Sequence, residues 1–113
     1  MMKPMPPQVI DQVASYFQVL SEPMRLRLLN LLREREYNVG ELAQACGTTA
    51  ANVSRHLSLM TKHGIVAREE RGTSVYFSIA DQRVDDLCEL VCGSIASRMQ
   101  AVSAVHDALK TML

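Results

Sequence analysis

The segment from Val39 to Gly64 is the feature that most constrains how this 113-residue chain can fold. A small residue (Ala43), a glycine (Gly47) and a β-branched residue (Val53) are spaced there as in a helix-turn-helix, where two helices cross closely around a tight turn. This spacing gives both helices an apolar inward face and gives the second helix a polar outward face. We therefore predict a helix-turn-helix over about 39–63, with an ordinary amphipathic helical hairpin as the alternative.

Two amphipathic helices are predicted before this segment. Residues 1–7 contain three prolines and no apolar core, so we expect a flexible N-terminal arm rather than a secretory signal. Apolar residues then recur at helical spacing over 8–20. We expect Ser21 to be the N-cap of a second helix, with Pro23 in the first turn, where its missing N–H costs nothing, and we expect this helix to end near Glu36.

A change of periodicity after Gly64 predicts a β-hairpin followed by a long helix. Two β-prone runs flank a polar, glycine-containing stretch, which indicates an antiparallel hairpin, or wing, over about 65–79. Helical spacing returns over about 83–110. The expected fold is mainly α with a small β-hairpin, in the order α-α-α-α-β-β-α, which is a winged helix-turn-helix formed by a single domain over 8–113. The apolar stripes of the first and last helices exceed what one small core can bury, which favours a homodimer.

Composition and charge exclude several classes of protein. Hydrophobic residues make up 48% of the chain, but no stretch approaches the roughly 18 uninterrupted apolar residues of a membrane span, so we expect no membrane partner and a cytoplasmic location. The odd number of cysteines, three, favours thiols over a disulfide framework. No glycine-rich phosphate loop, HExxH motif or recognisable Cys-His pair is present, which argues against an enzyme.

The net charge of zero requires any nucleic-acid contact to depend on a local basic face. Basic residues concentrate in the centre of the chain, and several acids lie in its C-terminal part. A helix that enters the major groove needs short side chains at its start and guanidinium, amide and hydroxyl groups along one face. Residues 49–63 have this composition, so we predict a recognition helix there.

Three segments resemble the ArsR/SmtB family of winged-helix bacterial repressors. They are LSEPMRLRLLNLL at 20–32, VSRHLSLMTKHGIV at 53–66 and RGTSVYFSI at 71–79. Together with the order of elements, the resemblance extends over nearly the whole chain. It implies a homodimer, built largely from the first and last helices, that binds double-stranded DNA at an inverted-repeat operator and blocks transcription until an inducer binds.

The resemblance also implies where the chain contacts DNA, namely through the second helix of the motif and the wing. Exposure favours DNA contact over solvation for Arg55, whereas His56 has two open alternatives, a contact with DNA or a bond within the fold. Glu69 and Glu70 would repel phosphate near the wing. The predicted DNA-binding residues are Thr49, Ala51, Asn52, Ser54, Arg55, His56, Lys62, Arg71 and Thr73.

The usual metal sites of the family are not matched. In zinc-sensing relatives the ligands lie on the last helix, at positions that correspond here to Asp81, Arg83, Ser94 and Ser97. Only the first of these is a metal ligand, because arginine has no lone pair to give and serine is a poor ligand for soft cations. In one type of arsenic sensor a Cys-x-Cys pair opens the first helix of the motif. The corresponding residues here are Asn38 and Gly40, so this site is missing as well.

Cys88 and Cys92, in LCELVCG, are the remaining candidates for an inducer site. Four residues apart on a helix, their sulfurs face one side and could bind a soft ion, such as arsenite or another thiophilic metal, if a second subunit completed the ligands. The same geometry suits a redox or persulfide sensor, and simple packing is the third alternative. Cys46 is expected to be buried, and a part in a sensor site is its alternative.

We therefore predict a sequence-specific DNA-binding transcriptional regulator. It would be a repressor released by a soft metal, a metalloid or a thiol-reactive inducer that acts at the cysteines of the last helix and changes the separation of the two recognition helices. Two alternatives stay open: the same DNA-binding fold without a thiol sensor, and a winged-helix protein-interaction module.

Overall fold

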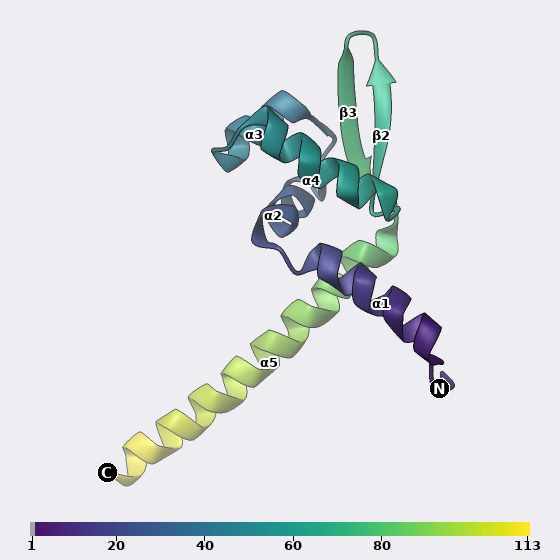
Figure 1. Cartoon of the computed structure of the whole chain (residues 1–113). Helices are drawn as coiled ribbons and strands as arrows, with labels where there is room; N and C mark the ends of the chain where they lie inside the picture. Colours follow the sequence, from purple (N-terminus) through teal and green to yellow (C-terminus); the bar gives the residue numbers. More distant parts are fainter. Residues whose placement is uncertain (1) are drawn as a thin grey trace. The chain divides into compact units, whose positions relative to one another are not determined.

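The computed structural model describes residues 2–113 (Figure 1). One compact unit ends at Asp81, and the other spans Gln82–Leu113. The elements are, in chain order, α1 (Pro7–Leu20), α2 (Pro23–Leu32), β1 (Tyr37–Asn38), α3 (Val39–Cys46), α4 (Ala50–Lys62), β2 (Val66–Arg71), β3 (Ser74–Ile79) and α5 (Gln82–Met112). The predicted fold class, a mainly helical winged helix-turn-helix, is confirmed.

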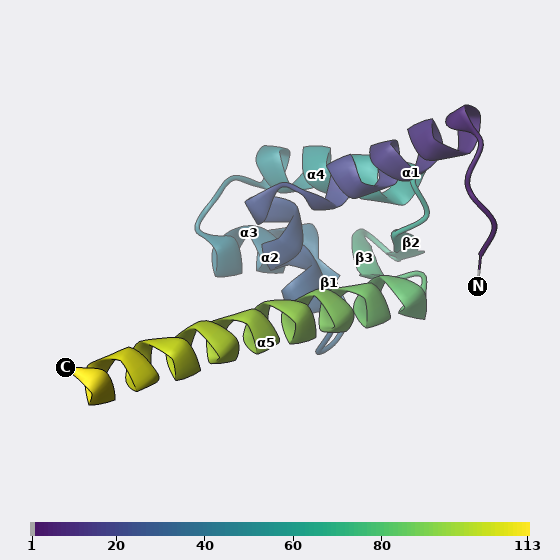
Figure 2. The same cartoon turned by 90° about the horizontal axis from the view of Figure 1, so that it is seen from below.

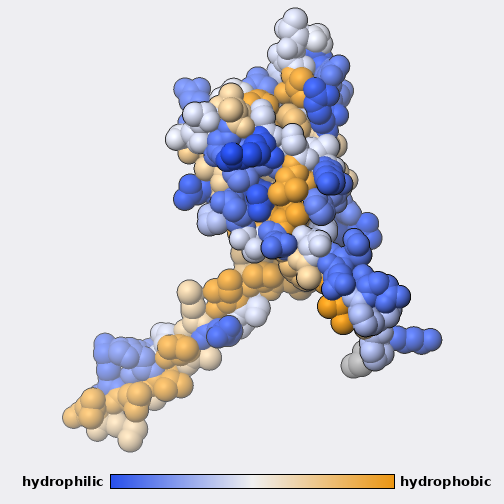
Figure 3. Space-filling view, in the orientation of Figure 1, coloured by the Kyte–Doolittle hydropathy of each residue, from blue (hydrophilic) through white to orange (hydrophobic). Residues whose placement is uncertain are grey.

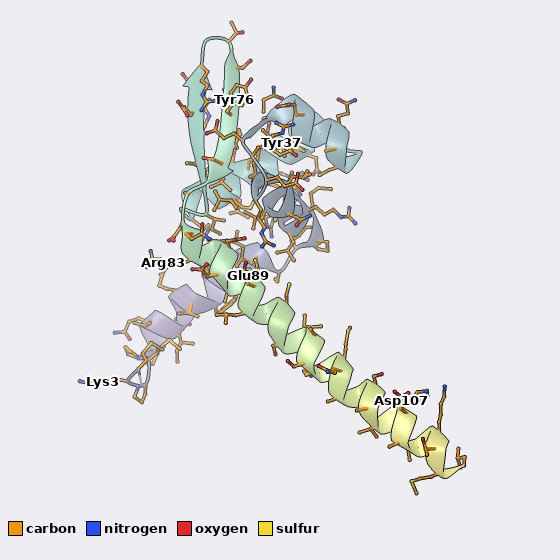
Figure 4. All side chains as sticks on the ribbon, turned by 180° about the vertical axis from the view of Figure 1, so that it is seen from behind. Lys3, Tyr37, Tyr76, Arg83, Glu89 and Asp107 are labelled. Atoms are coloured by element: carbon orange, nitrogen blue, oxygen red, sulfur yellow. The ribbon has the colours of Figure 1, made fainter. Side chains whose placement is uncertain are left out.

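The sheet has three antiparallel strands in the order β1-β3-β2, one more than the predicted hairpin. Tyr37 of β1 pairs with Phe77 of β3, and both side chains are buried; Asn38 pairs with Tyr76. Figure 4 labels Tyr37 and Tyr76 where these strands meet. β1 was missed because two residues are too few to show the alternation that identifies a strand.

The sequence favours strands over 65–68 and 75–79, and the observed strands β2 and β3 extend further toward each other, so the turn between them is shorter than predicted. Arg71 lies opposite Ser74, so the turn consists of Gly72 and Thr73 alone. Gly72 has a φ of 62°. Two-residue hairpins need a positive φ at the first turn position, which glycine adopts without the steric cost that other residues incur.

The start of α2 differs from the prediction. Ser21 is the C-cap of α1, and the N-cap of α2 is Glu22, whose carboxylate accepts a hydrogen bond of 3.0 Å from the backbone N–H of Arg25. A carboxylate at this position satisfies the same backbone donor that a serine hydroxyl would. Pro23 lies in the first turn, as predicted, and begins it because the cap is one residue later. α2 ends at Leu32 rather than near Glu36.

Side-chain caps begin both helices of the helix-turn-helix. Asn38 and Glu41 form a capping box at α3, with hydrogen bonds of 2.8 and 3.0 Å in the two directions. Gly47 ends α3 in the left-handed conformation, with a φ of 63°, and Thr49 caps α4 by accepting from the N–H of Asn52 at 3.1 Å. These caps satisfy backbone groups that helix ends leave unpaired, so the short turn is held by local interactions.

The core of the first unit lies among α2, α3, α4 and the base of the hairpin. Figures 1 and 2 show these helices grouped together, with the hairpin projecting from their edge. Leu42, Val53, Leu57 and Met60, which the spacing of the helix-turn-helix places on inward faces, are fully buried. Each such side chain contributes about 1.5–3 kcal/mol by leaving water. This packing fixes which face of α4 remains outside.

α5 is a single helix of 31 residues, about 46 Å long at 1.5 Å per residue. Apolar side chains recur along it every three or four residues and are between 47% and 69% exposed, namely Val91, Ile95, Met99, Val102, Val105 and Leu109. In Figure 3, hydrophobic surface follows α5 along much of its length, beside hydrophilic surface. Within the described chain, no helix combines the length and hydropathy that a membrane crossing requires.

Candidate nucleic-acid interface

The outward face of α4 brings together most of the predicted DNA-binding residues. Because Val53, Leu57 and Met60 point into the core, the opposite side of the helix is left in solvent. Its exposed residues, with the N-cap, are Thr49, Ala51, Ser54, Arg55, Ser58 and Lys62. The side chains are short near the start of the helix, so a partner surface can approach its backbone closely there.

Arg55 is held in place by neighbouring side chains at the start of α4. Its Nη2 donates to Oδ1 of Asn52, and Nδ2 of Asn52 donates to the hydroxyl of Thr48 at 3.1 Å. A guanidinium has five N–H donors, so this one bond leaves Arg55 donors for a ligand. The chain of bonds therefore restricts the Arg55 side chain before any contact is made, which lowers the entropic cost of binding.

A groove of about 490 Å³ runs between α4 and the hairpin. Its polar lining comes from Ser54, Ser58, Thr61, Lys62 and Arg68, and its floor from Val39, Val75 and Phe77. The sequence prediction included Ser54 and Lys62 but not Ser58 and Arg68. Arg68 pairs with Phe77 across the sheet, and both residues line the groove. The register of β2 with β3 would therefore have identified Arg68 as a residue of this groove.

Arg71 of the wing is bound by acidic neighbours. Its Nη2 lies 2.6 Å from Oε2 of Glu36 and 2.8 Å from Oε2 of Glu69, and its guanidinium stacks over the ring of Tyr76. Hydrogen bonds to Glu69 and Glu36 raise the pKa of Arg71, and the bond from Arg71 lowers the pKa of Glu69. The charge of Arg71 is compensated within the protein. Thr73, at the turn, is exposed.

His56 lies on the inward side of α4. Its side chain is 12% exposed, and its Nδ1 is 3.1 Å from Nη1 of Arg25 and 3.9 Å from Oε2 of Glu22. Of the two alternatives left open by the sequence, the structure forms the bond within the fold. The sequence could not decide between them because Arg25 is 31 residues away along the chain.

The cysteines are thiols, and they differ in exposure. Cys92 is exposed on α5 and Cys88 is half-buried. Cys46 is also half-buried, not fully buried as expected, because it lies at the end of α3. Among residues 2–113, no cluster of three or more His, Cys, Asp or Glu side chains is placed to hold a metal ion. Cys88 and Cys92 fit a soft ion in donor chemistry, but one copy of this pair supplies two ligands only.

Comparisons with known proteins agree with this arrangement. The family described as bacterial regulatory protein, arsR family, matches residues 22–68, which include α2, α3 and α4. The HTH-type transcriptional regulator Rv0081 of Mycobacterium tuberculosis is 37% identical over 79 residues, which cover 69% of this chain and 67% of that protein. Its crystal structure superposes with a TM-score of 0.78 over 85% of this chain and 96% of that one.

Two further relatives are a homodimeric DNA-binding domain and a repressor of a resistance operon. The homodimeric winged helix-turn-helix DNA-binding domain Mb0332 of Mycobacterium bovis has a TM-score of 0.75 at 28% identity, over 88% of this chain and 94% of that one. A probable mercury resistance operon repressor of Streptomyces lividans is 34% identical, over 71% of this chain and 64% of that protein. By its helix-turn-helix, its wing and these relatives, the chain belongs to the ArsR/SmtB family of winged-helix transcriptional regulators, which bind DNA and are not enzymes.

Proposed function

We propose that this regulator is a homodimeric repressor that inserts α4 of each copy into the major groove of an inverted-repeat operator. The exposed polar face of α4, with Arg55 held at its start, is the observation that carries the proposal. Such a face combines base-edge donors with close approach of the helix. The proposed contacts are Thr49, Ala51, Asn52, Ser54, Arg55 and Lys62 of the helix-turn-helix, with Thr73 at the wing.

We add Ser58 and Arg68 to these contacts and remove His56. A sugar-phosphate strand that follows the groove between α4 and the hairpin would meet Ser58, Lys62 and Arg68. His56 is left out because its Nδ1 already bonds Arg25 and its side chain is 12% exposed. Arg71 is a weaker contact than predicted, since a phosphate would compete with Glu36 and Glu69 for its guanidinium.

The apolar faces of α1 and α5 support the dimer. Val9, Ile10 and Phe17 of α1 are 41–50% exposed, and the stripe on α5 is exposed along the helix. A stable interface buries about 1,200–2,000 Å² of surface, and a second copy would cover apolar side chains that water otherwise contacts. The homodimeric Mb0332 domain supports this. We take 8–113 as one winged-helix domain.

The test of DNA binding is fluorescence anisotropy on a labelled duplex from the region upstream of the gene. We expect affinity to fall steeply with salt, because phosphate contacts release counterions. Arg55→Ala should weaken binding by roughly 10-fold or more, the cost of about one bidentate base or phosphate contact. The matched control is Arg27→Ala, an exposed arginine on α2. Affinity that ignores both salt and Arg55→Ala would favour a protein-interaction module instead.

We further propose that a thiophilic ion such as arsenite, or a thiol-reactive molecule, releases the repressor through Cys88 and Cys92. Two thiols one turn apart supply two soft ligands, and the same pair on a second copy would complete three or four. The mercury resistance operon repressor among the relatives supports an effector that prefers sulfur.

Titration of the protein–DNA complex with arsenite, cadmium, zinc, peroxide and persulfide identifies the class of effector. We expect one thiophilic agent to release wild-type protein and to leave the double variant Cys88→Ser/Cys92→Ser bound. Release of both proteins by the same agent, or of neither by any agent, would leave the cysteines as packing residues of the DNA-binding fold.

A further inference from the structure

The side chain of Arg25 joins three helices of the first unit. From the first turn of α2, its Nε donates to the carbonyl of Val19 and its Nη2 to that of Gln18 at 3.5 Å, both in the last turn of α1. Its Nη1 lies 3.1 Å from Nδ1 of His56, halfway along α4. One guanidinium therefore connects the C-terminus of α1, the N-terminus of α2 and the helix that carries the proposed DNA contacts.

The chemistry of this cluster fixes the direction of each bond. A guanidinium only donates, so Nδ1 of His56 accepts and the neutral imidazole carries its proton on Nε2. The carbonyls at the end of α1 carry partial negative charge, which favours a cation there. Oε2 of Glu22, which caps α2, lies 3.9 Å from the same Nδ1 and adds a negative charge beside Arg25.

The bond to His56 acts on α4 in a way that apolar packing does not. Val53, Leu57 and Met60 hold the helix by apolar burial, which fixes its inward face but contains no directional bond. The contact between Arg25 and His56, whose side chain is 12% exposed, is a charge-assisted hydrogen bond and is therefore directional. Arg55, the residue before His56 and about 100° from it around the helix, is exposed, so a rotation of α4 would move it directly.

We propose that Arg25 is a positioning residue that sets the rotation of α4 through His56 and ties that helix to the end of α1. The inference rests on the proposed DNA contact by α4, and it deepens that proposal by naming what aims the contact. Because α1 also carries Val9, Ile10 and Phe17 of the proposed dimer surface, the same guanidinium links subunit pairing to the setting of the recognition helix.

Operator affinity of the full-length protein, measured over a series of salt concentrations, tests this link. Arg25→Gln and His56→Leu should each weaken binding by roughly tenfold, the equivalent of one charge-assisted hydrogen bond. The double variant should be no weaker than the worse single variant, because both remove the same bond. The slope of log affinity against log salt should not change, since neither residue touches phosphate. His56→Asn, which keeps an acceptor near the place of Nδ1, should recover most of the affinity.

Three results would overturn the proposal. Additive losses in the double variant would mean that the two residues act separately. A slope reduced by about 0.9 in His56→Leu would mean that His56 contacts a phosphate. Wild-type affinity in both single variants would mean that the bond does not aim α4. Arg27→Gln, two residues along the same helix, is the matched control for loss of a positive charge.

A measurement without DNA separates failure of this inference from failure of the proposed function. The ¹⁵N shifts of the His56 imidazole should show a proton on Nε2 and an acceptor Nδ1 in the wild type, and the acceptor signature should be lost in Arg25→Gln. If the wild type binds no operator but shows this signature, the proposed function fails and the bond stands. If the shifts are the same in Arg25→Gln, the bond is absent whatever the DNA result.

Discussion

Individual arginines of this regulator differ in how much of their charge is available to a ligand. Arg71 is bound by Glu36 and Glu69, whereas Arg55 contacts only the neutral amide oxygen of Asn52 among the bonds described. Both were candidates by sequence, because residue type alone does not reveal a partner such as Glu36, 35 residues before Arg71. The residues that share α4 were predictable from helical period, but the partners of Arg71 and His56 depend on the tertiary fold.

Arg68 gives a prediction at the scale of one ion pair. Its Nη1 lies 2.9 Å from Oε1 of Glu70, and both side chains are largely exposed. Glu70→Gln removes a charge that repels phosphate and releases Arg68 toward the groove, so operator affinity should rise about two- to fivefold at low salt. Arg68→Ala should lower affinity and reduce the salt slope by about 0.9. If neither variant differs from wild type in an anisotropy titration, the groove does not hold the DNA backbone.

The capping box of α3 is the element whose contribution to stability can be measured most directly. Asn38→Ala removes the acceptor for the N–H of Glu41 and should lower the free energy of unfolding by about 1 kcal/mol, measured with urea. Asn38→Asp keeps an acceptor at the N-cap and should retain most of that stability. Equal losses in the two variants would show that Asn38 acts through β1 rather than through the cap.

The same box predicts a pH dependence. The hydrogen bond from the backbone of Asn38 and the neighbouring Arg35 lower the pKa of Glu41 in the folded chain. A carboxylate with a lowered folded pKa stabilises the fold above its unfolded pKa of about 4.3, and this stabilisation is lost as the pH falls through the folded value. In Glu41→Gln, the free energy of unfolding should therefore fall less steeply below about pH 5 than it does in the wild type. The measurement is chemical denaturation of both proteins at several acidic pH values. The same dependence of stability on pH in the two proteins would show that Glu41 has no such role.

Element boundaries show where sequence patterns suffice and where they do not. The helix-turn-helix was predictable from Ala43, Gly47 and Val53, because the turn and the contact between its two helices are made by residues close together in the sequence. The sequence could not show whether Ser21 or Glu22 is the N-cap of α2, because either side chain can accept a hydrogen bond from a backbone N–H in the first turn. β1 depends on pairing with a strand about 40 residues later, and no local signal specifies that pairing.

At the scale of the whole molecule, the apolar stripe of α5 predicts the state of assembly. Ile95→Glu or Val102→Glu places a charge within the proposed interface and should shift sedimentation from dimer to monomer, with loss of operator binding at the same protein concentration. Ser97→Glu, about 200° around the helix from Ile95, is the matched control and should leave the dimer intact. A dimer that survives both stripe substitutions would place the interface elsewhere.

The exposed stripe of α5 has a consequence for gene dosage. If the operator is occupied only by paired chains, pairing and DNA binding draw on the same pool of protein. At concentrations where most copies are unpaired, the amount of dimer varies with the square of the amount of chain, so a cell with half the protein has about a quarter of the repressing species. The gene under control would then respond to synthesis or dilution of its regulator with a threshold, even before an inducer is present.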